Sequence, residues 1–176
     1  MKICYLDIDG VLNSEQEVMM HARRGIAVHY QFCPIACSNL QGILVAVPDA
    51  RIVITSTWRV YHPLKELKLI LAMNYIDEEK VIDVTPQGVL SQVASSSVSR
   101  GGDRGDQIQK WMDNNGTPER FVIIDDDADM GHLMPHLVRT NSKHGLMLEQ
   151  AEIVIKMLKG EYDGIFTLRG DSDAKI

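Results

Sequence analysis

The chain has 176 residues, of which 45% are hydrophobic and 24% charged, and its formal net charge is −6. This composition is typical of one globular domain and excludes a disordered chain, a collagen and a coiled coil. The acidic balance disfavours a protein that coats nucleic acid electrostatically, because such proteins are basic. No apolar stretch approaches the roughly 20 residues of a membrane helix, and the N-terminus lacks the apolar segment of a signal peptide. With three cysteines, an odd number that favours reduced thiols, we expect a cytoplasmic protein without membrane attachment.

Short apolar runs of strand length alternate along the chain with segments of helical periodicity. Five runs predict strands, at residues 3–6, 51–55, 80–84, 121–124 and 137–140. Four segments predict helices, at residues 34–47, 63–73, 105–114 and 148–159. This alternation is typical of parallel strands connected by helices. The sequence therefore predicts an α/β fold, a doubly wound, Rossmann-like parallel sheet of about five strands with helices on both faces.

Two internal stretches and the C-terminal end lack a clear period. Residues 13–32 carry charge and histidine, and residues 87–103 are rich in serine and glycine, so we expect loops in both. Loops at the mouth of an α/β sheet often carry substrate contacts. We expect one domain over residues 1–160, with a short flap at 13–32 after the first strand, and a polar tail at 161–176.

Two carboxylates follow the first predicted strand directly. Asp7 and Asp9 are two residues apart, so in an extended chain they point the same way. Gly10 supplies the backbone freedom that a tight turn needs. Two like charges on one face are costly unless a cation or a proton lies between them. On these residues alone, a metal-assisted site and a solvated turn are equally open.

A second acidic cluster follows the fourth predicted strand. It places four carboxylates within five residues, at Asp125, Asp126, Asp127 and Asp129. The carboxyl ends of parallel strands share one edge of a doubly wound sheet, where ligands bind. If the first and fourth strands are neighbours, Asp7, Asp9 and Asp126 converge and offer the hard oxygen ligands that magnesium prefers. The two clusters together predict a Mg²⁺ site rather than an unstructured acidic loop.

These motifs resemble, in order across residues 3–129, the four signature motifs of the haloacid dehalogenase (HAD) superfamily of phosphohydrolases. The first motif is similar to Leu-Asp-Ile-Asp-Gly at residues 6–10, which implies that Asp7 is the nucleophile and Asp9 the general acid and base. The second is similar to Thr-Ser-Thr-Trp-Arg at residues 55–59. It implies a phosphate-binding hydroxyl at Ser56, with Thr55 as the alternative.

The third and fourth motifs supply a cation and further carboxylates. The third is a Lys or Arg at a helix start, which Arg104 resembles most closely and Arg100 less well. The fourth is the second acidic cluster, where the resemblance implies Asp126 as a metal ligand, Asp125 as its neighbour and Asp129 as a further member. Together with Asp7 and Asp9, these carboxylates form the metal set that we expect for Mg²⁺.

The resemblance implies a magnesium-dependent phosphomonoesterase that works through an aspartyl-phosphate. A carboxylate attacks phosphorus only if charge on the phosphoryl oxygens is neutralised, which Mg²⁺, Arg104 and Ser56 would do. Asp9 would protonate the leaving oxygen and then activate a water molecule. Its presence argues against dehalogenation, because a departing halide needs no proton.

The expected substrate follows from the short flap and from a likeness to small, nearly capless HAD domains, some of which accompany RNA-repair enzymes. We expect a terminal phosphate on a nucleic acid, or a nucleotide, held by Arg23, Arg24 and Arg59. For Trp58, a role in packing is the preferred interpretation, and stacking on a base is the alternative. The alternatives are a phosphatase of a small phosphometabolite such as a sugar phosphate, and a catalytically weak binding or regulatory module. A monomer and a homodimer are both open.

Overall fold

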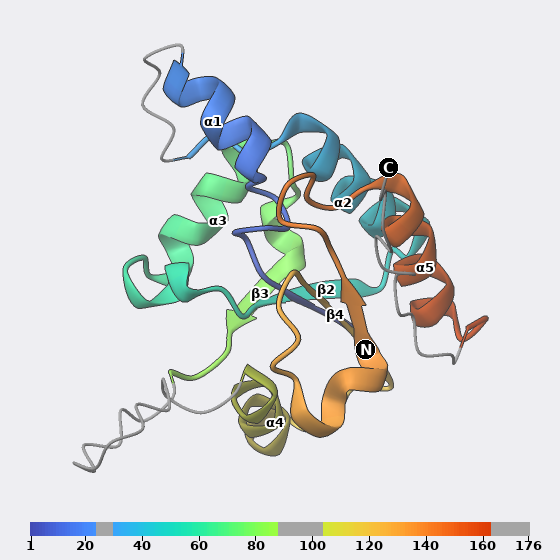
Figure 1. The fold of residues 1–176 in the computed structure, drawn as a ribbon. Coiled ribbons are helices and arrows are strands. Elements are labelled where there is room, and N and C mark those ends of the chain that lie inside the picture. The colour runs from blue at the N-terminus through green and yellow to red at the C-terminus, as the bar shows by residue number, and fades with distance from the viewer. Residues whose placement is uncertain (24–29, 88–103, 163–176) are drawn as a thin grey trace, which may run out of the picture.

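The polypeptide forms a sheet with helices on both sides in the computed structural model, which describes residues 1–23, 30–87 and 104–162 (Figure 1). The strands of the described residues are β1 (Lys2–Leu6), β2 (Ala50–Ile54), β3 (Val81–Val84), β4 (Arg120–Asp125) and β5 (Leu137–Arg139). Their α-helices are α1 (Glu15–Arg23), α2 (Pro34–Ala46), α3 (Leu64–Met73), α4 (Arg104–Asn115) and α5 (Leu148–Lys159). Short 3₁₀ helices are η1 (Thr57–Val60), η2 (Glu78–Lys80) and η3 (Gly131–His136). All predicted strands, and the helices now labelled α2 to α5, are confirmed to within a residue at each end.

The strands form one parallel sheet in the order β3-β2-β1-β4-β5. The chain begins at the centre, winds outward to β3 and then returns to the other side of β1, which confirms the doubly wound α/β fold. In the register, Leu6 at the end of β1 lies beside Ile54 of β2 and Ile124 of β4. The residues that follow these three positions therefore lie at one level, at the carboxyl edge of the sheet.

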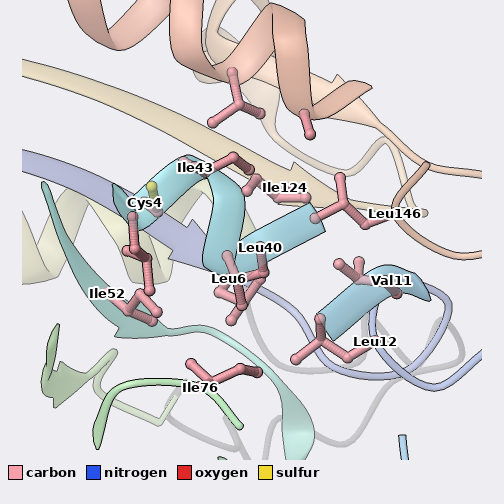
Figure 2. Packing of buried hydrophobic residues seen from close by; sticks show 14 of the residues in the cluster. Cys4, Leu6, Val11, Leu12, Leu40, Ile43, Ile52, Ile76, Ile124 and Leu146 are labelled. Carbon is pink, nitrogen blue, oxygen red and sulfur yellow. The ribbon is translucent and has the colours of Figure 1, made fainter. Parts of the chain in front are cut away.

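Each face of the sheet is covered by helices. Alternate residues of β1 point to opposite faces. Cys4 and Leu6 pack with α2, α3 and α5, whereas Ile3 and Tyr5 pack with α4 and η3. Figure 2 shows Leu40 of α2 on the first face, among the buried side chains of the sheet. Each fully buried Ile or Leu contributes about 1.5–3 kcal/mol relative to exposure, so the central strands hold the site on a rigid base.

The expected flap is partly helical, and the prediction of a loop over its whole length is wrong. α1 occupies part of it, and its helicity depends on polar contacts. The Ser14 hydroxyl accepts a hydrogen bond from the Glu17 backbone N–H at 3.3 Å, as an N-terminal cap does. Glu17 also pairs with His21, four residues later, at 3.0 Å. His21 is the only buried residue of this helix, so α1 buries no apolar stripe against the core.

Several expectations lie outside the described residues. Residues 24–29 of the flap, including Arg24, are among them, as are residues 88–103 of the expected serine-rich loop, including Arg100, and residues 163–176 of the expected tail. Within the described part of the chain, no helix combines the length and the apolar character that crossing a membrane requires.

Candidate active site

Three carboxylates meet where β1 and β4 end. Asp7 follows β1, Asp125 is the last residue of β4, and Asp126 comes next. One oxygen of each lies within 4.8 Å of the others. The Asp7 backbone N–H donates to the Ile124 carbonyl at 3.0 Å, which continues the β1–β4 pairing by one residue. The strand register thus brings these carboxylates together although they are distant in sequence.

Arg104, the first residue of α4, supplies the positive charge of the site. Its Nη1 atom lies 3.0 Å from Asp7 Oδ2 and 2.9 Å from Asp125 Oδ2. Burial disfavours the charged guanidinium, but the two carboxylates outweigh burial and raise the pKa of Arg104. One cation therefore bridges the predicted nucleophile and a buried carboxylate.

Asp129 positions Arg104 rather than joining the three carboxylates. Its side chain accepts a hydrogen bond from the Arg104 backbone N–H at 3.3 Å, and its carbonyl accepts one from the Gly105 N–H at 3.3 Å. A Cβ atom at Gly105 would lie 2.2 Å from the Met130 carbonyl oxygen, so only glycine permits this close approach. The start of α4 is thereby fixed against the loop that follows β4.

The electrostatics of the cluster favour a bound cation. Burial, reinforced by the charge of Asp7 and opposed by that of Arg104, raises the pKa of Asp125 to about 8. Burial and Asp7 also raise the pKa of Asp126. Three hard oxygen donors whose charges repel one another fit Mg²⁺, which relieves that repulsion. Asp7, Asp125 and Asp126 are therefore the residues that would hold the ion.

Gly10 lets Asp126 approach the loop after β1. Its φ angle is +74°, and a Cβ atom there would lie 2.2 Å from Asp126 Cγ. The Gly10 carbonyl accepts a hydrogen bond from the Thr140 hydroxyl at 2.8 Å, which ties this loop to the end of β5. Both the backbone angle and the space require glycine at this position.

The carboxylate of Asp9 lies outside the group of three. Its Oδ1 accepts a hydrogen bond from Asn13 Nδ2 at 3.0 Å, and its Oδ2 accepts one from Trp58 Nε1 at 2.9 Å. The role of Asp9 as a metal ligand stays a prediction. Sequence reasoning missed Asn13 and the indole N–H of Trp58 as partners of Asp9. The sequence held a signal only for Asn13, which lies four residues after Asp9 in the same turn.

The hydroxyls of the second motif have different surroundings. Ser56 Oγ accepts from the Trp58 backbone N–H at 3.4 Å and caps η1. Thr55 Oγ1 is buried and has no hydrogen-bond partner among the described residues. Thr57 lines a pocket of about 500 Å³, together with Asp7 and Arg104. Sequence reasoning missed Thr57, although a third hydroxyl in the Thr-Ser-Thr run was a signal for it.

The same pocket has walls from three further places in the chain. These walls are the turn after β1, the start of α1 and the loop after β5. Their residues are Asp9, Gly10, Asn13, Glu15, Val18 and Ser142, with Asp126 beside them. Glu15 is held in place because its side chain accepts a hydrogen bond from the Ser142 hydroxyl at 2.8 Å. α1 is thus anchored as one wall of the pocket.

The arginines expected to bind substrate are placed differently from one another. The Arg59 guanidinium donates to the carbonyls of Thr55, Ser56 and Thr85, and also contacts Gln107 of α4. It therefore holds the ends of β2 and β3 against α4. Arg23 is exposed at the end of α1 and is not among the residues that line the pocket.

The comparisons with known proteins agree with this geometry. Residues 3–151 match the family described as the HAD domain in Swiss Army Knife RNA repair proteins. The HAD domain of the effector protein Lem4 from Legionella pneumophila is similar in structure, with a TM-score of 0.54 and 20% sequence identity, covering 90% of this chain and 94% of that one. An inactive mutant of that domain has the same TM-score at 17% identity, covering 89% and 94%.

No curated protein matches the chain. The match to the family model nevertheless spans β1 to the start of α5 and includes all the carboxylates described above. The chain therefore belongs to the HAD superfamily, in the family of the HAD domains of Swiss Army Knife RNA repair proteins.

Proposed function

We propose that this HAD domain is a magnesium-dependent phosphomonoesterase in which Asp7 is the nucleophile. One observation carries the proposal. Asp7 lies on the pocket wall with Arg104 at 3.0 Å, and its carboxylate shares a 4.8 Å cluster with Asp125 and Asp126. A nucleophile, a fixed cation and a divalent-cation site around one pocket are the parts that phosphoryl transfer to a carboxylate needs.

The reaction has two steps on this chain's own residues. In the first, an Asp7 oxygen forms a bond to phosphorus while the bond from phosphorus to the leaving oxygen breaks, and Asp9 gives that oxygen a proton. In the second, Asp9 takes a proton from a water molecule whose oxygen displaces Asp7 from phosphorus, which releases inorganic phosphate. Arg104 pairs with the charged phosphoryl oxygens throughout. A bound Mg²⁺ would supply further neutralisation of those oxygens.

The proposed substrate is a terminal phosphate on a nucleic acid, or a nucleotide. It is supported by the family, whose description names RNA repair proteins, and by the small size of α1, which forms the helical wall of the pocket within the described residues of the expected flap. An open rim of this kind admits the end of a polymer, whereas a large cap encloses a small molecule. Contacts of Arg23 and Arg24 with the nucleic-acid backbone are part of the proposal.

The test is magnesium-dependent phosphate release over one panel of esters. The panel holds 3′-phosphorylated and 5′-phosphorylated oligonucleotides, mononucleotides and sugar phosphates, each with and without a chelator. Protein carrying Asp7→Asn is the blank for every substrate. Selective release from an oligonucleotide end is the expected result. Release from sugar phosphates alone would overturn the substrate, and no release from any ester would overturn the enzymatic function.

A further inference from the structure

The carboxylate of Asp9 is held by two neutral N–H donors, one on each oxygen. Asn13 Nδ2 lies 3.0 Å from Oδ1, and Trp58 Nε1 lies 2.9 Å from Oδ2. Asn13 is nearby in the same turn, where the Gly10 N–H donates to its carbonyl at 3.0 Å. Trp58 comes from η1, beyond the end of β2. Its bond to Asp9 therefore ties the first motif to the second.

The indole of Trp58 is fixed by aromatic neighbours. Its centroid lies 5.6 Å from that of Phe32, at an interplanar angle of 66°, and 6.2 Å from that of Tyr30, at 77°. The His62 ring follows at 5.7 Å, and the indole packs against the buried cluster under α2 and α3. Edge-to-face pairs of this kind stabilise by about 0.5–1.5 kcal/mol each. The direction of the indole N–H is thus set by packing.

We propose that Trp58 is a positioning residue that holds the Asp9 carboxyl group in place for proton transfer to and from the reacting oxygens. The proposal rests on the proposed phosphatase function, in which Asp9 is the acid and then the base. Each carboxylate oxygen has two lone-pair positions, so the bond from Trp58 leaves one position on Oδ2 free to carry the transferred proton. Trp58 is absent from the residues that line the pocket, which agrees with action through Asp9.

If Trp58 positions Asp9, the effect of removing the indole N–H depends on the leaving group of the ester. A nitrophenolate departs from phosphorus with little need of a proton, whereas the alkoxide of a nucleoside or an alkyl ester departs only if it is protonated. Loss of the indole N–H therefore has its effect on esters with basic leaving groups. A purely structural role for Trp58 would lower activity toward both kinds of ester alike.

The experiment compares kcat/KM of wild type and Trp58→Phe with p-nitrophenyl phosphate and with a nucleoside monophosphate. We expect a loss of about 10- to 100-fold for the nucleotide, the range for a misplaced catalytic group, and of less than about threefold for the nitrophenyl ester. Trp111→Phe is the matched control, because it removes an indole N–H that donates to another carboxylate, Asp83 Oδ2 at 2.7 Å, in the cluster on the other face of the sheet. It should affect both esters equally and slightly.

A double variant identifies the route of the effect. If Trp58 acts through Asp9, then Trp58→Phe added to Asp9→Asn should cause no further selective loss with the nucleotide. Equal losses on both esters in Trp58→Phe would overturn the proposal while leaving the phosphatase function intact. Wild-type protein that releases phosphate neither from these two esters nor from the phosphorylated oligonucleotides would instead overturn the phosphatase function.

Folding of the variant is checked by circular dichroism before the kinetics. If Trp58→Phe fails to fold, site-specific replacement of Trp58 by benzothienylalanine removes only the N–H from a ring of nearly the same shape. The same selective loss of kcat/KM with the nucleotide is then expected. An equal change in kcat/KM, relative to wild type, with both esters would overturn the proposal.

Discussion

Replacing Gly10 by alanine tests whether the loop after β1 and the carboxylate of Asp126 form one metal site. The new Cβ atom would lie 2.2 Å from Asp126 Cγ and 2.4 and 2.6 Å from its two oxygens. Non-bonded heavy atoms pack at about 3.5–4.0 Å, so the carboxylate must move by about an ångström. The backbone at φ +74° adds a cost of about 1–2 kcal/mol for a residue with a side chain.

The expected loss is largest in the stabilisation by magnesium. At a Mg²⁺ concentration 100 times the dissociation constant, binding stabilises the wild-type fold by about 2.7 kcal/mol. If the displaced carboxylate lowers affinity by about 100-fold, the same concentration stabilises the variant by about 0.4 kcal/mol. For a chain of this size, each kcal/mol of added stability raises the melting temperature by about 2–4 °C. Magnesium should then raise the melting temperature by about 5–11 °C in wild type and by about 1–2 °C in Gly10→Ala.

The assay is thermal unfolding with and without magnesium, and the chain offers a matched control. Gly116 also has a positive φ of +88°, but among the described residues no heavy atom lies within 4 Å of its added Cβ. Gly116→Ala should therefore lower the melting temperature without metal and keep the full gain from magnesium. A wild-type gain in Gly10→Ala, or a lost gain in Gly116→Ala, would refute this account of the site.

Three further predictions concern the carboxylates and the hydroxyls. Asp7→Asn should keep the circular dichroism spectrum but reduce phosphate release below about a tenth of wild type; higher residual turnover would contradict its role as nucleophile. The pKa of Asp125, about 8 in the folded state, exceeds its unfolded value of about 4, so its stabilisation is present at low pH and is lost as pH rises through about 8. Urea unfolding of metal-free protein at about pH 5 and about pH 8 should show this loss. Asp125→Asn should remove the part of the loss due to Asp125 and leave the part due to Asp126, whose pKa is also raised. Ser56→Ala should cost about 1 kcal/mol of stability as a lost cap with KM unchanged, whereas Thr57→Val should raise KM; the reverse pattern would assign the phosphate-binding hydroxyl to Ser56.

The fold could be predicted because its strands and most of its helices are encoded by local apolar patterns. Leu40 and Ile43 of α2 are fully buried and stand at helical spacing after the proline that begins the helix. α1 has no such pattern, because its cap at Ser14 and its Glu17–His21 pair are polar. Single polar contacts of this kind are too common in loops to identify a helix.

The sequence could predict only those site residues that lie at the ends of neighbouring strands. Asp7 and Asp125 come together because β1 and β4 are neighbours, as the parallel-sheet argument requires. Asp9 lines the same pocket as Asp7 but lies outside the group of three carboxylates, because the chain after β1 turns and pairs Asp9 with Asn13. Arg59 turns inward and donates to the Ser56 carbonyl, three residues earlier, and to the Thr85 carbonyl after β3. Only the tertiary fold brings Thr85 close, so no local pattern indicates the direction of Arg59.

The central place of β1 has a consequence for the newly made chain. β1 pairs with β2 on one side and with β4 on the other, and β4 is synthesised long after β2 and β3. Until β4 docks, the backbone groups along one edge of β1 are unpaired. The side chains of β1 are apolar and are buried on both faces of the sheet in the finished fold. Exposed edges of this kind pair readily with other chains. A fragment that ends after β3 should therefore aggregate, and the docking of β4 both closes this edge and brings Asp125 to Asp7.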